Sequence, residues 1–147
     1  RRVLFRSLSS FVIVQNNISF NDKAGATRGL HAEPWNKFIS TANGRVFGAW
    51  CDLRQGDSFG RVFTHEINPG TAIFVPKGVA NGYQTLDDNI AYTYLVDAHW
   101  SPDAKYTFVN LFDPELGIDW PISQDRAIIS EKDAAHPLLS NVTPMKV

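Results

Sequence analysis

A short stretch in the first third of the chain gathers side chains that are suited to chemistry. Within residues 26–38, Arg28, His31 and Lys37 stand among apolar residues, with a glycine and a proline between them. A histidine accepts a proton near neutral pH, an arginine grips an anionic oxygen with two donors, and a lysine stabilises developing negative charge. This composition indicates proton transfer on an anionic substrate. The alternative is a solvated turn between two strands.

The elements that must position these side chains are expected to be β-strands. Turn-forming residues recur along most of the chain, and the segments between them are β-branched, aromatic and too short for helices. These segments are residues 45–53, 61–67, 71–75 and 90–96, preceded by a strand-like run at 11–14. The spacing is typical of an all-β sandwich or barrel. Residues 130–135 are the one expected helical turn, near the C-terminal end.

Alternation along a strand predicts which side chains share a face. Tyr92 and Tyr94 are two residues apart and should face the same way, either into the core with their hydroxyls bonded to backbone or into a site. The same rule would send Arg28 and His31, three residues apart, to opposite faces. We expect Gly29 to bend the strand there, so that both side chains reach one side.

Composition and charge exclude several classes of partner. The 147 residues predict one domain. The formal net charge is −1 and the chain has no basic run, so the sequence gives no sign of a positively charged surface that would bind nucleic acid or a membrane. No apolar run is long enough for a membrane-spanning helix. Cys51 is the single cysteine, so an internal disulfide is excluded and a buried, inert thiol is expected. We therefore expect a cytoplasmic protein.

The first residues are expected to lie outside the domain. Arg1, Arg2 and Arg6 precede any strand pattern, and the chain does not begin with methionine. We therefore divide the chain into an unmatched segment, residues 1–10, and a single domain, residues 11–147, and interpret the chain as a fragment. A functional basic arm is the alternative.

A series of motifs occurs in a fixed order along most of the chain. The most specific are Gly-Ile-Asp-Trp-Pro at residues 117–121 and Ser-Glu-Lys-Asp at 130–133, whereas Arg-Gly-Leu-His at 28–31 is weak alone. The full series comprises residues 14–19, 28–31, 37, 44–47, 52–54, 74–78, 94, 100–102, 116–121 and 130–133. It resembles the dTDP-4-dehydrorhamnose 3,5-epimerase family of cupin-like jelly rolls.

The resemblance implies a fold and an activity. The fold would be an all-β jelly-roll sandwich with short helical turns near the C-terminus, assembled as a homodimer. The activity would be inversion of C3 and C5 of a dTDP-4-keto-6-deoxyhexose through an enolate, in dTDP-L-rhamnose synthesis, with no metal and no redox cofactor. In some relatives a similar domain is followed by a reductase, so a fused or partner reductase is a further expectation.

The resemblance also assigns catalytic roles, and the residue types suit the chemistry. A hydrogen beside a ketone is weakly acidic, so its removal needs a base at the carbon and a positive charge or donor at the oxygen. His31 would be the base, with its imidazole oriented by Asp133, and Lys37 would lie near the C4 oxygen. Tyr94, rather than Tyr92, would be the acid on the opposite face of the sugar. The alternative for Lys37 is a solvated strand residue.

The substrate contacts follow from the same resemblance. Gln15, Asn17 and Arg28 would hold the thymidine diphosphate, with Trp100 beside the ligand where the family often has a tyrosine. Gln15 and Asn17 could instead close a turn. Asn81 stands where the family usually has a histidine, and an amide cannot carry a proton at neutral pH. Substrate scope or the extent of epimerisation is therefore expected to differ.

Other functions stay open. A 3-epimerase or a ketoisomerase acting on a related nucleotide sugar would use the same base. A non-catalytic sugar-nucleotide-binding jelly roll would keep Arg28 and Trp100 but has no use for a base, an oriented carboxylate and an opposing acid. A metal-dependent cupin could begin with His31 and Glu33, but Asn81 does not supply the histidine that would complete its ligand set.

Overall fold

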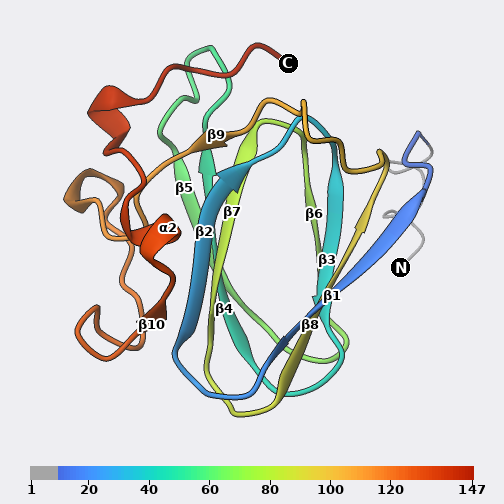
Figure 1. The fold of residues 1–147 in the computed structure, drawn as a ribbon, viewed down its shortest axis with the longest axis vertical. Coiled ribbons are helices and arrows are strands. Elements are labelled where there is room, and N and C mark those ends of the chain that lie inside the picture. Colours follow the sequence, from blue (N-terminus) through green and yellow to red (C-terminus); the bar gives the residue numbers. More distant parts are fainter. Residues whose placement is uncertain (1–9) are drawn as a thin grey trace.

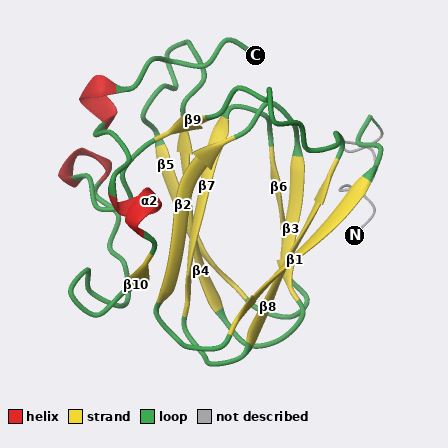
Figure 2. Ribbon diagram, in the orientation of Figure 1, coloured by secondary structure: helices red, strands yellow, loops and turns green. Residues whose placement is uncertain are grey.

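Two β-sheets face each other in the computed structural model, which describes residues 10–147 (Figures 1 and 2). The first sheet has the strand order β1 (Gln15–Asn21), β8 (Ile90–Val96), β3 (Lys37–Thr41), β6 (Ala72–Val75). The second has the order β10 (Ile128–Ile129), β2 (Ala26–Ala32), β7 (Val79–Thr85), β4 (Val46–Asp52), β5 (Val62–Ile67), and β9 (Thr107–Phe108) also pairs with β2. All pairs are antiparallel except β10 with β2. The expected all-β jelly-roll architecture is confirmed.

The expected strands are present as β4, β5, β6 and β8, and the expected helical turn is α2 (Glu131–Ala134). Two 3₁₀ turns, η1 (Pro114–Leu116) and η2 (Leu139–Asn141), flank it in the chain. No helix within residues 10–147 is long and apolar enough to cross a membrane. Of the segment expected to lie outside the domain, residues 1–9 fall outside the described part of the chain.

The strand expected at residues 11–14 is wrong, because regular pairing begins only at Gln15. Val12 and Ile13 are more than half exposed. Val14 donates a single backbone hydrogen bond to the carbonyl of Val96. The apolar run therefore joins no strand ladder: Phe11 packs against Phe38 and Phe74, and the composition of the run alone could not show this.

Buried side chains form two clusters, one on each face of the second sheet. Between the sheets lie Ile39, Val46, Trp50, Ile67, Val75, Tyr83, Ile90 and Tyr92. On the outer face, β2, β4 and β7 pack against the C-terminal segment through Leu30, Ala32, Ala49, Cys51, Leu53, Ala80, Val109, Leu111, Leu116 and Leu139. Strand β4 is thus buried on both faces, which explains its nearly continuous apolar sequence.

The outer cluster explains why the Cys51 thiol is inert and why the His31 side chain points between the sheets. Cys51 is fully buried as expected, and burial, with the nearby Asp52 and Asp113, raises the pKa of its thiol to about 12, so it stays protonated and unreactive. Leu30 and Ala32 both point into this cluster. Because side chains alternate along β2, His31 between them points the other way, into the space between the sheets.

Candidate active site

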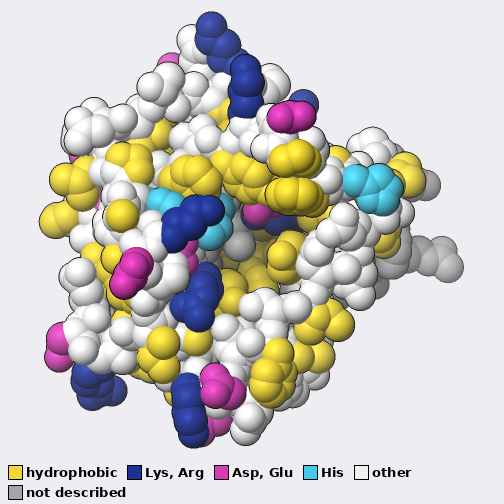
Figure 3. Space-filling model, in the orientation of Figure 1, with side chains coloured by type: hydrophobic (Ala, Val, Ile, Leu, Met, Phe, Trp, Pro, Cys, Tyr) yellow, Lys and Arg dark blue, Asp and Glu magenta, His cyan; other side chains and the backbone are white. Residues whose placement is uncertain are grey.

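A cavity of about 200 Å³ lies between the two sheets. Figure 3 shows that this face of the molecule is hollowed, with histidine and basic side chains along one side of the hollow. Both sheets contribute to its wall, and most of the lining side chains are polar or ionisable. The lining residues are Ser19, Arg28, Gly29, His31, Glu33, Lys37, Asn81, Tyr83, Tyr92 and Tyr94.

Strand β2 carries Arg28 and His31 into this one cavity because it bends between them. The pairing of β2 with β7 shifts register between these two residues, and Gly29 has a φ of +118°. A Cβ atom on Gly29 would lie 2.6 Å from the Cα of Gly82, so only glycine fits. The expected bend is confirmed. The Arg28 guanidinium donates to the backbone carbonyls of Thr27 and Ile128, which fixes its orientation.

The expected contact between His31 and Asp133 is present. His31 Nε2 lies 2.7 Å from Asp133 Oδ1, and Figure 1 places α2, which carries Asp133, beside β2. Ser130 caps the turn by accepting a hydrogen bond from the Asp133 backbone N–H. Burial works to raise the pKa of Asp133, but the hydrogen bond and charge of His31 and the Ser130 contact outweigh it and lower that pKa. Asp133 is therefore an ionised carboxylate held against the imidazole.

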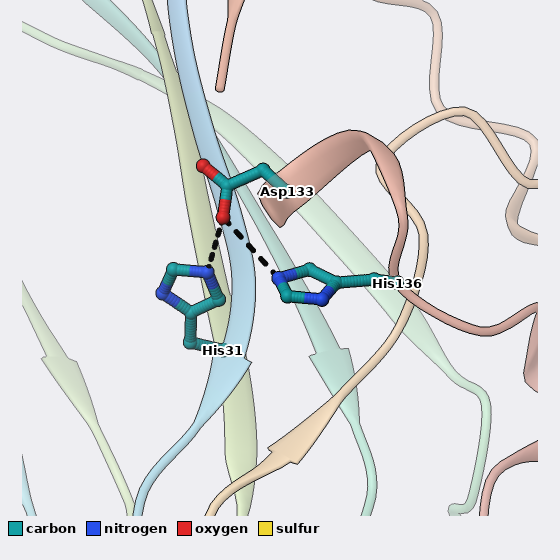
Figure 4. A group of neighbouring side chains, drawn as sticks. All are labelled: His31, Asp133 and His136. Atoms are coloured by element: carbon teal, nitrogen blue, oxygen red, sulfur yellow. Dashed lines mark hydrogen bonds and ion pairs between the residues drawn. The ribbon is translucent and has the colours of Figure 1, made fainter. Parts of the chain in front are cut away.

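His136 is a third member of this group that the sequence interpretation missed. Its Nε2 lies 3.2 Å from the same Asp133 oxygen, and its ring stands at 81° to the His31 ring with centroids 5.2 Å apart (Figure 4). On its other side the ring stacks on Phe108, with centroids 4.6 Å apart. The spacing of three residues within one turn was the available indication that His136 and Asp133 are neighbours.

The ligand-type atoms of His31, Asp133 and His136 lie within 4.8 Å of one another, a composition that transition metals accept. Both nitrogen–oxygen separations are hydrogen-bond distances, so hydrogen bonds account for the group. The cupin metal set considered from the sequence started instead from His31 and Glu33. Within residues 10–147, no group of three metal-type donors contains both His31 and Glu33. Glu33 is instead paired with Lys37.

Lys37 is buried, so the alternative of a solvated strand lysine is wrong. Only 3% of the residue is exposed, and its Nζ lies 3.2 Å from Glu33 Oε2. Burial lowers the pKa of Lys37, and the charge and hydrogen bond of Glu33 partly oppose that shift. The pair brings one ammonium group, with a compensating carboxylate, to the wall of the cavity.

Tyr92 and Tyr94 both face the cavity, as alternation along β8 predicts, but they differ in burial and contacts. Tyr92 is buried, its ring stacks on Tyr83, and its hydroxyl lies 3.3 Å from Asn81 Oδ1, to which it donates. Tyr94 is only partly buried and lines a second cavity as well. Burial raises the pKa of both phenols. Both are therefore neutral hydroxyls that can donate a proton.

The second cavity, of about 60 Å³, adjoins the first through Glu33 and Tyr94. Gln15 and Asn17 face it from β1, where the Gln15 amide donates to Asn17 Oδ1 at 2.6 Å. Trp100, which is 62% exposed, lies at its rim. Trp35 and Tyr106, which the sequence interpretation did not single out, complete an aromatic wall.

The candidate residues thus fall into two neighbouring groups. Arg28, His31, Lys37, Asn81 and Tyr94 surround the first cavity, with Asp133 behind His31. Gln15, Asn17 and Trp100 surround the second. This arrangement brings an imidazole, a phenol and an ammonium group to one small space, beside a second, smaller cavity.

Residues 3–141 match the family model described as dTDP-4-dehydrorhamnose 3,5-epimerase. The chain is 51% identical over 136 residues to a protein RmlC homolog of Streptococcus pyogenes serotype M6, covering 90% of this chain and 68% of that protein. It is 34% identical over 128 residues to dTDP-4-dehydrorhamnose 3,5-epimerase of Mycobacterium tuberculosis, covering 81% of this chain and 62% of that protein. The solved structure of RmlC from Streptococcus suis in complex with dTDP-D-xylose superposes with a TM-score of 0.85 at 45% identity, covering 99% of this chain and 74% of that one.

Proposed function

Because the chain belongs to the dTDP-4-dehydrorhamnose 3,5-epimerase family, a family of isomerases, we propose that it inverts C3 and C5 of a dTDP-4-keto-6-deoxyhexose. The product would feed dTDP-L-rhamnose synthesis. One observation carries this proposal. His31 on one sheet and Tyr94 on the facing sheet line the same cavity, and His31 is paired with the carboxylate of Asp133 behind it. Inversion of a carbon needs a base and an acid on opposite faces of the sugar, and this arrangement supplies both.

His31 is the base in this proposal. To act as a base, the ring must carry its hydrogen on Nε2, which lies 2.7 Å from Asp133 Oδ1. The lone pair is then on Nδ1, the nitrogen that Figure 4 draws away from Asp133. That nitrogen removes the hydrogen beside the ketone. The resulting imidazolium is stabilised by the ionised Asp133, which therefore lowers the barrier to proton removal.

Lys37 stabilises the enolate. A proton leaves the carbon only if negative charge can accumulate on the C4 oxygen, and a donor placed there contributes about 3 kcal/mol to typical enzymes. Lys37 suits this role because its ammonium is held at the cavity wall by Glu33 and cannot swing into solvent. Removal of water around the charge strengthens its interaction with the developing enolate.

Tyr94 returns a proton from the opposite face. It belongs to β8 of the first sheet, whereas His31 belongs to β2 of the second, and both line one cavity. Its partly buried phenol remains protonated at neutral pH because burial raises its pKa. Reprotonation by Tyr94 inverts the carbon, whereas reprotonation by His31 restores the substrate.

Arg28 and the second cavity are assigned to the nucleotide. Arg28 offers a forked cationic contact to phosphate oxygens, Gln15 and Asn17 offer amides for polar groups, and Trp100 offers an aromatic face at the rim. A 3-epimerase acting on a related nucleotide sugar is the second candidate. It is favoured by Asn81, whose side-chain oxygen accepts a hydrogen bond from Tyr92 and whose amide cannot act as an acid at neutral pH.

We propose further that the protein forms a homodimer through the edge of the first sheet. Strand β1 lies at the end of that sheet, where Ile18 and Phe20 are about two-thirds exposed. An apolar edge strand pairs readily with another chain. A cytoplasmic location and a fused or partner reductase, both expected from the sequence, remain part of the proposal.

Solvent exchange tests the activity directly. The protein is incubated with dTDP-4-keto-6-deoxyglucose in deuterated water, and deuterium at C3 and C5 is followed by NMR. Deuterium at both carbons with formation of the epimer supports the 3,5-epimerase, and deuterium at C3 alone supports the 3-epimerase. Binding of the nucleotide sugar without any exchange would refute both and favour a binding protein.

A further inference from the structure

The carboxylate of Asp133 has a second imidazole partner whose purpose the proposed function leaves unexplained. We propose that His136 is a positioning residue: it donates a second hydrogen bond to Asp133, which fixes the direction of the carboxylate oxygen and divides its charge between two imidazoles, while the shorter His31 contact persists without it. This rests on the proposed function only in taking His31 as the base. His136 itself touches neither the first nor the second cavity.

The burial of Asp133 explains why a second donor is needed. The residue is only 4% exposed, and a buried carboxylate is costly unless hydrogen bonds satisfy it. Asp133 Oδ1 lies 2.7 Å from His31 Nε2 and 3.2 Å from His136 Nε2. Since both contacts end on one oxygen, they fix the direction in which that oxygen points.

The helix that carries Asp133 cannot fix the side chain alone, because α2 has only four residues. His136, in contrast, is held on several sides. Its ring stacks on Phe108 at an interplanar angle of 15°, its side chain is 7% exposed, and its backbone carbonyl accepts a hydrogen bond from the Asn110 amide. It therefore serves as a rigid support for the carboxylate.

The burial of His136 favours a neutral ring that donates. Burial lowers the pKa of His136, the charges of His31 and Lys132 add to this, and Asp133 opposes it. The lowered pKa leaves the imidazole neutral at neutral pH, so the hydrogen in the contact with Asp133 must be on Nε2. Phe108, which packs against the ring from β9, brings no charge.

A hydrogen bond to an ionised carboxylate stabilises that form, so the donor from His136 takes up part of the negative charge that His31 would otherwise receive. With His136 in place, Asp133 therefore stabilises protonated His31 less than it would alone. The other ionisable groups that line a cavity together with His31 are Arg28, Glu33, Lys37, Tyr83, Tyr92, Tyr94, Tyr106 and Lys132. None of these side chains is hydrogen-bonded or ion-paired to Asp133, so their effect on His31 is the same in all variants at residue 136.

The test compares two replacements of His136. His136→Phe keeps a ring against Phe108 but removes the donor. His136→Gln keeps an N–H donor at nearly the position of Nε2. The titration of His31 is followed by NMR of labelled histidine, with His31→Gln to assign its resonance, and the acid limb of kcat/KM is measured alongside. This first readout does not depend on activity.

We expect the pKa of His31 to rise by about one unit in His136→Phe, since a hydrogen bond to a charged group is worth about that much. The acid limb of kcat/KM should move up equally, and His136→Gln should restore both. An unchanged or lowered pKa in folded His136→Phe, or no restoration by His136→Gln, overturns the proposal. If His136→Phe does not fold, His136→Asn, whose amide is too short to reach Oδ1, replaces it. A wild-type protein without deuterium exchange would refute the proposed function while leaving the NMR comparison intact.

Discussion

Replacing Tyr94 with phenylalanine should separate proton removal from inversion. His31 and Tyr94 reach one cavity from opposite sheets, so each serves one face of the sugar. Phenylalanine keeps the aromatic ring between the two cavities and deletes only the donor. The enolate still forms, but it is reprotonated from the side of His31. We therefore expect solvent deuterium to enter the substrate while little epimer accumulates.

The size of the loss follows from the role of Tyr94. A positioned acid contributes about 10²- to 10⁴-fold to the rate, which corresponds to roughly 3–5 kcal/mol of transition-state stabilisation. Tyr94 is only partly buried, so the substitution should have little effect on the free energy of unfolding. Tyr92→Phe is the matched control. It removes the hydrogen bond that the buried Tyr92 donates to Asn81 Oδ1, and such a side-chain hydrogen bond contributes about 1 kcal/mol to stability.

The two variants should therefore differ in opposite ways in melting temperature and in net epimerisation. Tyr94→Phe should keep its melting temperature, retain deuterium incorporation and lose net epimerisation. Tyr92→Phe should melt at a lower temperature and still invert the sugar. NMR of the sugar in deuterated water measures both exchange and inversion in one sample. If Tyr92→Phe lost inversion and Tyr94→Phe retained it, the assignment of the acid would be wrong.

Three further outcomes follow from the site. Lys37→Met should lower kcat about 10²-fold or more with less effect on substrate binding, and a change confined to KM in steady-state kinetics would contradict its role at the enolate. Gly29→Ala should lower the melting temperature strongly, because its Cβ would meet Gly82 Cα at 2.6 Å with φ at +118°; an unchanged melting curve would refute that packing argument. The pKa of Asp133 is lowered in the folded state, so its stabilising contribution is complete above the ordinary carboxyl pKa of about 3.9 and is lost as pH falls through the lower folded value. The stability difference between wild type and Asp133→Asn in chemical denaturation should therefore shrink below about pH 4, and a constant difference would contradict it.

Much of the fold could be predicted because local sequence determines it. Turn residues separate β-branched and aromatic segments at positions that match β4, β5, β6 and β8. The bend at Gly29 could be inferred because two expectations disagreed. Arg28 and His31 were expected in one site, whereas regular alternation along a strand would place their side chains on opposite faces. The pairing of His31 with Asp133, which are far apart in the sequence, came from the ordered motifs and not from spacing.

The remaining features depend on tertiary contacts that no local rule contains. His136 reaches Asp133 because its ring is supported by Phe108 on a different strand. The ion pair of Lys37 with Glu33 depends on burial, which a polar residue at a strand end does not reveal. Residues 11–14 have the composition of a strand, but only the last of them, Val14, donates a backbone hydrogen bond to a strand of the sheet.

Deuterium exchange by wild type and His31→Ala tests the central claim most directly. The claim is that His31, oriented by Asp133, removes the hydrogen beside the ketone of a dTDP-4-keto-6-deoxyhexose. Wild type should incorporate solvent deuterium at C3 and C5 of dTDP-4-keto-6-deoxyglucose, and His31→Ala should bind the same nucleotide sugar but incorporate none above the uncatalysed rate. Exchange that persists in folded His31→Ala would contradict the account.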